Sequence, residues 1–233
     1  SAACEILPRI KSLGGEFFDR SGKIAITTPL FKKVVDEYLA MKDYSSSDVN
    51  YWWEDALYSF TSGLSAMTIL FINRASTIIR ANSLLTYNKV GVAPVPGNYP
   101  LLGGGSIGIS NQSRHPDRCI EFLKWVYNDE IANMITLLGG LSPCQTVFRN
   151  EEILEVYPWL RNIREYFKSG SRRITGKRYP RFDNYHFERI LGSAVRSAAM
   201  GLTSPEKALE NAQRQCDTEL KKTKEIEAVL RKH

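Results

Sequence analysis

The chain has 233 residues, of which 43% are hydrophobic, and it carries a formal net charge of +6 at pH 7. These values are typical of a globular protein with one large domain or two smaller lobes, and they argue against a disordered or strongly basic chain. The longest apolar run, around Ala66 to Ile72, has the length of a strand and is far short of the roughly 20 residues that cross a bilayer.

The first forty residues indicate a helix, a hairpin and a second helix. Glu5 to Leu13 has apolar residues at helical spacing, which predicts an amphipathic helix. Phe17 to Ile26 combines a turn sequence with β-branched alternation, which is typical of a hairpin. Thr28 followed by Pro29 predicts the next helix, because threonine caps a helix and proline fits its first turn.

Three strands are predicted in the following part of the chain. Ala66 to Phe71 is continuously apolar, as expected for a strand buried on both faces. Val90 to Val95 ends among prolines, which places it at a sheet edge or a strand end. Gly103 to Ser110 is a third candidate, whose glycines permit a bend or the close approach of a ligand. Predicted helices over Tyr51 to Thr61 and Ser76 to Ala81 alternate with the strands, which favours an α/β fold with a parallel or mixed sheet.

The second half of the chain is predicted to be almost entirely helical. Its strongest start signal is Thr203-Ser204-Pro205-Glu206, in which a cap and a proline precede an acidic residue at the positive end of the helix. In the helix that begins at Pro116, the residues from Ile120 to Val126 supply apolar faces. The predicted helices cover Pro116 to Tyr127, Glu130 to Leu138, Pro158 to Phe167, Tyr185 to Met200 and Pro205 to Arg231.

No residue pattern indicates catalysis, a cofactor or a metal site. The four cysteines lack metal-ligand spacing, and the three histidines form no Ser-His-Asp or Cys-His arrangement. A disulfide remains open. Glu54 and Asp55 are paired carboxylates of the kind that glycosidases use, but neighbours on a helix point about 100° apart. An exposed helix start is therefore the better interpretation of this pair, and we predict that the chain is not an enzyme.

Two further segments have alternative interpretations. Ser1 to Cys4 weakly resembles a lipoprotein cleavage site, but no apolar segment precedes it in this sequence, so Cys4 is interpreted as part of an opening helix. Arg172 to Arg181 is the densest basic stretch and mixes arginine with tyrosine, glycine and proline. We interpret it as a solvated loop, with contact to an anionic ligand or partner as the alternative and nucleic acid below that.

Six motifs follow one another in order along nearly the whole chain. They are Phe60-x-Ser62-Gly63-x-x-Ala66-Met67, Val90-Gly91-Val92-Ala93-Pro94-x-Pro96-Gly97, Gly104-Gly105-Ser106-x-Gly108-Ile109-Ser110, Glu121 to Val126, Gly139-Gly140-x-Ser142-Pro143, and Gly201 to Leu209. The set resembles the carbohydrate-type extracellular solute-binding proteins of bacterial ABC importers. This resemblance implies a helix-rich α/β fold of the type II periplasmic-binding-protein class, with the C-terminal lobe and part of the N-terminal lobe present.

The resemblance also implies a domain plan and partners. Residues 1–100 belong to the second lobe, residues 101–149 cross to the first lobe, and residues 150–233 return to the second. Proteins of this family are usually longer, so the chain is expected to lack most of its first lobe. The family binds a sugar between two lobes that close by hinge bending, and it delivers the sugar to membrane permease subunits. The implied location is the periplasm or the cell surface, with a lipid anchor in the full-length parent.

Two alternatives to this plan are kept open. The same fold also serves as the extracellular ligand-sensing domain of some receptors, so a sensor is the alternative function. A lobe with unpaired strands would in addition favour a homodimer.

Sugar binding in this family places aromatic faces against the C–H faces of the ring and polar groups against its hydroxyls. Trp53 is preferred over Trp52 as the stacking residue. Phe71 stands where the family usually has a stacking tryptophan, with a core position as the alternative, and Gly103 to Ser106 either meets ligand or only bends the crossing between lobes. The predicted ligand-binding residues are Trp52, Trp53, Phe71, Asn73, Arg74, Gly104, Gly105, Ser106, Ser142, Arg181 and Tyr185.

Overall fold

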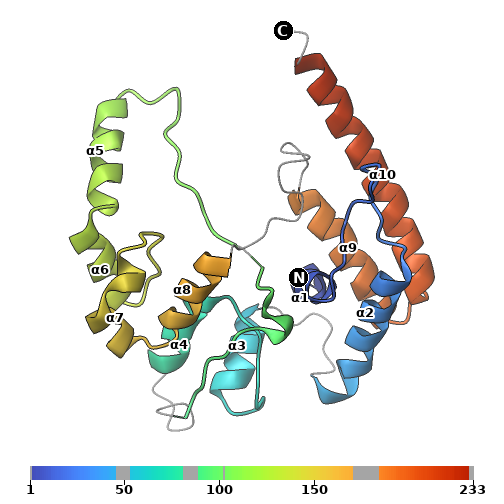
Figure 1. Cartoon of the computed structure of the whole chain (residues 1–233), viewed down its shortest axis with the longest axis horizontal. Coiled ribbons are helices and arrows are strands. Elements are labelled where there is room, and N and C mark those ends of the chain that lie inside the picture. The colour runs from blue at the N-terminus through green and yellow to red at the C-terminus, as the bar shows by residue number, and fades with distance from the viewer. Residues whose placement is uncertain (1, 46–52, 81–88, 102, 170–183, 231–233) are drawn as a thin grey trace. The chain divides into compact units, whose positions relative to one another are not determined.

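The structure is a computed structural model that describes residues 2–45, 53–80, 89–101, 103–169 and 184–230. In these ranges the regular secondary structure is helical, apart from one antiparallel β-bridge. The chain divides into two compact units, which Figure 1 displays with their helices labelled. Unit 1 comprises residues 1–52, 95–102 and 171–233, and unit 2 comprises residues 53–94 and 103–170.

Unit 1 is built from four helices around one apolar core. They are α1 (Ala2–Ser12), α2 (Pro29–Ala40), α9 (Asn184–Ala199) and α10 (Pro205–Leu230), with the short 3-10 turns η1 (Met41–Tyr44) and η3 (Pro96–Asn98). Thr28 caps α2 as predicted, because its hydroxyl accepts a hydrogen bond from the Phe31 N–H at 3.4 Å. The fully buried side chains of the core include Ile6, Leu7, Ile10, Phe17, Ile26, Phe31 and Phe187.

The predicted hairpin is present between α1 and α2. Phe18 pairs with Ile24 in the antiparallel bridge, and the Asp19 N–H donates to the Lys23 carbonyl at 2.8 Å. Gly22 has a φ of 81°, a left-handed conformation that glycine adopts without steric cost. The hairpin positions Phe17 on the core side, where it is 1% exposed.

Gln213 of α10 binds the second arm of this hairpin as a neighbouring strand would. Its amide oxygen accepts from the Ile26 N–H at 2.9 Å, and its amide nitrogen donates to the Ile24 carbonyl at 2.7 Å. The same nitrogen lies 3.1 Å from Asp217 Oδ1. One side chain therefore satisfies two backbone groups that have no strand beside them among the residues that the structure describes.

Replacing Gln213 with leucine is expected to lower the free energy of unfolding by about 1–3 kcal/mol, because both backbone groups lose their partner. The Gln213→Glu variant keeps the acceptor for Ile26 but places a carboxylate oxygen against the Ile24 carbonyl and Asp217 Oδ1, so it should be destabilised at least as much as the leucine variant. Denaturant unfolding gives the energies, and faster hydrogen exchange at the Ile26 amide locates the effect. Unchanged exchange at that amide in the leucine variant would contradict the assigned role.

Unit 2 contains shorter helices around a second core. They are α3 (Trp53–Thr61), α4 (Ala75–Arg80), α5 (Pro116–Val126), α6 (Asp129–Leu137), α7 (Glu151–Val156) and α8 (Leu160–Ser169), with the 3-10 turns η2 (Ile72–Arg74) and η4 (Val147–Arg149). The core is formed by Ala75, Ala132, Val147, Phe148, Ile153, Leu154, Tyr157, Trp159 and Leu160. None of its members comes from α5, which has no buried residue.

The predicted helices are confirmed within two residues at the ends that the structure describes, except at one start. The helix predicted from Glu5 begins at Ala2, so Pro8 lies inside it and not near its start. Helix α7 was not predicted, although Asn150 caps it by accepting from the Glu152 N–H at 3.1 Å.

The three strands predicted from Ala66, Val90 and Gly103 are wrong as strands, because the described parts of these segments form no β-ladder. The burial expected for Ala66 to Phe71 is also missing: Met67 is 87% exposed and Ile69 is 49% exposed. A strand is defined by hydrogen bonds to a neighbouring strand, and the described residues supply no neighbour here. An apolar segment can adopt a strand conformation, but the segment by itself does not supply the neighbouring strand that a ladder requires.

The two units do not coincide with the predicted lobe segments of residues 1–100, 101–149 and 150–233, since residues 53–94 associate with residues 103–170. The units follow from contacts within this chain, whereas the lobes refer to the halves of a complete binding protein. The lobe assignment therefore stays a prediction.

All four cysteines are free thiols. Burial raises the pKa of Cys216 to about 12 and also raises that of Cys4, so these two thiols stay protonated and unreactive at neutral pH. Across the described ranges, no helix is both long and apolar enough to span a membrane.

Candidate functional site

Two of the predicted aromatic residues meet in unit 2. Trp53 begins α3, and Phe71 is the residue before η2, so the two residues lie 18 positions apart in sequence. Their ring centroids lie 5.1 Å apart and the ring planes cross at 78°, an edge-to-face contact. Both side chains are half-buried. The pair therefore combines a fixed geometry with aromatic surface that solvent still reaches.

A charged pair lies beside these aromatic rings. Arg74, three residues after Phe71, donates from Nη2 to Glu54 Oε1 at 2.9 Å, and Glu54 directly follows Trp53. The side chains of Arg74 and Glu54 are 37% and 59% exposed. The carboxylate holds the guanidinium in place, which leaves its other N–H groups available in geometry to hydroxyl oxygens. The Arg74–Glu54 pairing was not predicted, although each residue was considered separately.

The first residue of the glycine run from Gly103 to Ser106 contacts the ring of Phe71. A Cβ atom at Gly103 would lie 2.9 Å from Cε1 of Phe71, so the Gly103 backbone packs directly on the ring. At Gly104 and Gly105 an added Cβ would meet nothing within 4 Å, and both residues are exposed, as is Ser106. Only Gly103 is thus required by packing. We call Trp53, Glu54, Phe71, Arg74 and Gly103 the aromatic corner.

The other predicted ligand residues are placed elsewhere or are not described. Asn73 lines a small pocket of about 10 Å³ beside Thr136 and Tyr157, with space for about one water molecule. Ser142 is 4% exposed, and its hydroxyl accepts from the Cys144 N–H at 3.3 Å. Tyr185 is 76% exposed on α9 of unit 1. Trp52 and Arg181 lie outside the described residues, as does the basic stretch from Arg172 to Arg181.

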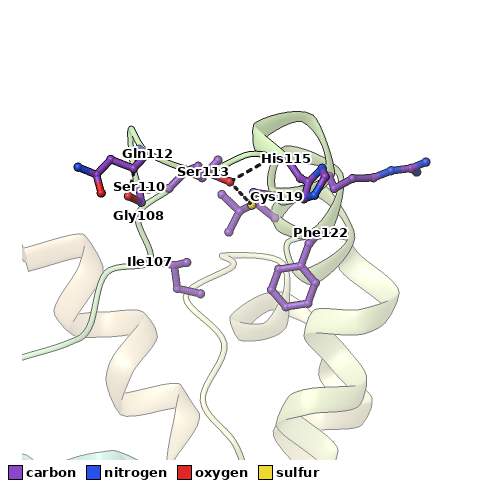
Figure 2. Close-up of a pocket in the computed structure, with 11 residues that line it drawn as sticks. Ile107, Gly108, Ser110, Gln112, Ser113, His115, Cys119 and Phe122 are labelled. Carbon is purple, nitrogen blue, oxygen red and sulfur yellow. Dashed lines mark hydrogen bonds between the residues drawn. The ribbon is translucent and has the colours of Figure 1, made fainter.

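A second feature of unit 2 is a hollow that sequence reasoning missed. It has a volume of about 570 Å³ and lies between residues 107–113 and α5 (Figure 2). Ile107 from the segment and Phe122 from α5 flank it, and Ser113 joins its two walls by accepting from the His115 N–H at 3.2 Å and contacting Cys119 Sγ at 3.8 Å. The signal for it in the sequence was the pair of isoleucines at 107 and 109 before an apolar helix face.

Neither feature has the composition of a metal site. In the portion of the chain that the structure describes, no group of three or more His, Cys, Asp or Glu side chains is placed to hold a metal ion. The aromatic corner instead offers ring faces, one guanidinium and exposed backbone amides. That combination suits a neutral, hydroxyl-rich ligand.

Comparison with known proteins decides the family. The sequence profile of the family described as bacterial extracellular solute-binding protein matches residues 11–158, which is well over half of the chain. The chain belongs to this family. A curated relative from Sinorhizobium fredii (strain NBRC 101917 / NGR234), the probable amino-acid ABC transporter periplasmic-binding protein y4oP, is 24% identical over 150 residues. The match covers 64% of this chain and 35% of the relative.

Solved structures of solute-binding proteins share the fold. Maltose-bound MalE3 of T. maritima superposes with a TM-score of 0.78 and is 23% identical in sequence, and the match covers 92% of this chain. The ribitol complex of a solute-binding protein from Agrobacterium radiobacter K84 superposes with a TM-score of 0.77 and is 24% identical, and the match covers 93% of this chain. The maltotriose-bound MalE domain of Bdellovibrio bacteriovorus superposes with a TM-score of 0.68 at 19% sequence identity, and the match covers 93% of this chain. The predicted type II periplasmic-binding-protein fold is therefore confirmed for this solute-binding protein.

This solute-binding protein spans only part of its relatives. It covers 56% or 57% of the length of these three solved chains and about a third of the curated relative. The relatives named above are binding proteins. Glu54, the carboxylate considered for acid–base work, is held in an ion pair.

Proposed function

We propose that this chain carries the carbohydrate-binding role of an extracytoplasmic solute-binding protein of a bacterial ABC importer. Support comes from the family match and from three solved structures of the same fold, whose bound ligands are maltose, ribitol and maltotriose. The partners of this function are the ligand and the permease subunits of the importer, and no catalytic step or cofactor is involved. In the full-length protein a lipid anchor holds the binding protein at the membrane surface.

The aromatic corner is the observation on which the assignment of a site rests. The half-buried rings of Trp53 and Phe71 supply aromatic surface for the apolar side of a sugar ring, a contact that favours pyranoses and polyols over charged solutes. Arg74, fixed by Glu54 at 2.9 Å, adds hydrogen-bond donors for the hydroxyls at the rim of that ring. The neighbouring Gly104 and Gly105 bring exposed backbone groups to the same ligand.

The name of the curated relative points to a different ligand class, an amino acid. An amino acid needs a charged partner for its carboxylate and another for its ammonium group. In the aromatic corner Arg74 and Glu54 are already paired with each other, so binding an amino acid there would first break a 2.9 Å ion pair. This observation makes the carbohydrate the preferred ligand.

Titration calorimetry of the chain with maltose, maltotriose, ribitol and a set of amino acids distinguishes the two classes. We expect heat of binding from at least one of the sugars or the polyol and none from the amino acids. Binding of amino acids alone would remove the carbohydrate assignment. No binding by any of these compounds would remove the aromatic corner as a ligand site of this chain.

Replacing Trp53 with alanine is expected to weaken the best carbohydrate ligand by about 10- to 100-fold, which corresponds to roughly 1.4–2.8 kcal/mol of lost aromatic contact. Trp53→Phe keeps a ring and should retain most of the affinity. Calorimetry measures the affinities, and circular dichroism checks that α3 remains folded.

The matched control for this prediction is Tyr58→Ala. Tyr58 is also an aromatic residue of α3 and is 67% exposed, but it does not belong to the aromatic corner. Its removal should leave the affinity within a factor of two. An equal loss in Trp53→Ala and Tyr58→Ala would place the ligand away from Trp53.

A further inference from the structure

Two side-chain contacts join the start of α3 to η2 and the residue before it. Trp53 and Phe71 meet edge to face with ring centroids 5.1 Å apart, and Glu54 and Arg74 form an ion pair with 2.9 Å between Oε1 and Nη2. Glu54 directly follows Trp53, and Arg74 is three residues after Phe71. The ion pair is therefore part of the same small interface as the rings, so a ligand that covers either ring lies next to both charges.

The ion pair keeps part of its hydrogen-bonding capacity for a ligand. The hydrogen bond within it uses only Nη2 of Arg74 and Oε1 of Glu54. The other N–H groups of the guanidinium are donors, and the second carboxylate oxygen of Glu54 is an acceptor. Donors and an acceptor thus lie side by side at the edge of the aromatic surface.

A hydroxyl is the ligand group that such a pair accommodates. It both donates and accepts, so one hydroxyl can accept from the guanidinium and donate to the carboxylate. A ligand carboxylate only accepts and is repelled by Glu54, whereas an ammonium group only donates and is repelled by Arg74. Because the two charges cancel, the pair offers no net attraction to an ion of either sign.

Without Glu54, the same arginine would be a receptor for anions. A guanidinium presents a planar set of donors that matches a carboxylate or a phosphate in two parallel hydrogen bonds. Glu54 occupies part of this set from within the chain, so an anionic ligand has to compete with a tethered carboxylate. The aromatic surface is the same for a polyol and for the acid with the same carbon skeleton. Discrimination between these two ligands therefore falls to the ion pair.

We propose that Glu54 is a specificity-determining residue, which neutralises Arg74 and thereby makes the aromatic corner select neutral sugars and polyols and reject sugar acids and sugar phosphates. This inference rests on the proposed function, since it concerns the same site, and it extends that function from the class of ligand to the residue that sets the charge of the ligand.

Two matched pairs of ligands test the role of Glu54. Ribitol and ribonate share a carbon skeleton and differ only in a terminal hydroxymethyl or carboxylate group, and so do maltitol and maltobionate. Titration calorimetry at pH 7 gives the ratio of acid affinity to neutral affinity for each variant. We expect the wild type to bind the neutral compound of at least one pair and to favour it over the acid at least tenfold. Glu54→Gln should raise the acid-to-neutral ratio at least tenfold, because the freed guanidinium gains a charge-assisted hydrogen bond to the acid.

Two further variants assign the effect to these residues. Adding Arg74→Gln to Glu54→Gln should abolish the gain in acid affinity, which separates capture by the guanidinium from the mere removal of a negative charge. Glu151→Gln is the matched control: Glu151 pairs with Arg161 at 2.9 Å, with side chains 63% and 42% exposed, in unit 2 but outside the aromatic corner. It removes the same charge and should leave the ratio within about a factor of two. Circular dichroism checks that the variants remain folded.

The outcomes distinguish this inference from the proposed function. Neutral ligands that bind with the same acid-to-neutral ratio in Glu54→Gln as in the wild type would overturn the role of Glu54 and leave the proposed function standing. An equal rise in Glu151→Gln, or a gain that persists without Arg74, would overturn it as well. A wild type that binds neither polyol, with acid binding gained in Glu54→Gln, would support the masking of Arg74 and remove the carbohydrate assignment. No binding by any variant would overturn both.

Discussion

Replacing Phe17 with alanine is expected to lower the free energy of unfolding of unit 1 by about 3–5 kcal/mol, the range for removal of a buried phenylalanine. Phe17 is 1% exposed and makes two edge-to-face contacts, with Phe31 at 5.7 Å and with Phe187 at 5.7 Å between ring centroids. These three rings come from the hairpin, α2 and α9. The substitution therefore removes the side chain that joins three segments of the core.

Circular dichroism during denaturant unfolding measures this change, and the core offers a graded control. Phe17→Leu preserves most of the buried volume and should cost no more than about half as much. Tyr185→Ala, at a side chain on α9 that is 76% exposed, should cost about 0.5 kcal/mol or less. A loss below 1 kcal/mol in Phe17→Ala would mean that the three-ring cluster does not hold the core together.

Replacing Gly97 with valine is expected to destabilise unit 1 by about 2–5 kcal/mol, because two independent penalties add. The first is conformational: Gly97 has a φ of 77°, which costs a side chain with a Cβ roughly 1–2 kcal/mol. The second is steric, because a Cβ at this position would lie 2.2 Å from Cβ of Ser12 at the end of α1. Relieving such an overlap costs roughly 1–3 kcal/mol more. The glycine of the Pro94-x-Pro96-Gly97 motif thus attaches η3 to α1.

A double-mutant cycle separates the two penalties. Ser12→Gly removes the atom that the new side chain would strike, so adding it to Gly97→Val should restore the steric part and leave the conformational part. Gly91→Val is the matched control, since a Cβ at Gly91 meets nothing within 4 Å. Equal destabilisation by Gly91→Val and Gly97→Val would show that contact with Ser12 is unimportant.

The aromatic corner illustrates how far the sequence led toward a site. Trp53, Phe71 and Arg74 were selected separately, from an aromatic residue before acidic residues and from the residues that follow an apolar run. Their contact across 18 residues of sequence, and the ion pair between Arg74 and Glu54, depend on how α3 and η2 pack. Ser142 was selected from the motif Gly139-Gly140-x-Ser142-Pro143, but the structure buries it in a turn. Its role in ligand binding stays a prediction.

The sequence by itself determined the positions of most helices and of the hairpin, because caps, turn residues and apolar periods act within a few neighbouring residues. The ordered motifs along the chain indicated the family. Only the tertiary structure decided which segments meet: it joined residues 53–94 to 103–170 and placed Gly103 against Phe71. Strand formation and burial are properties of pairs of segments distant in sequence, so the alternation in one segment specifies its faces but not what covers them.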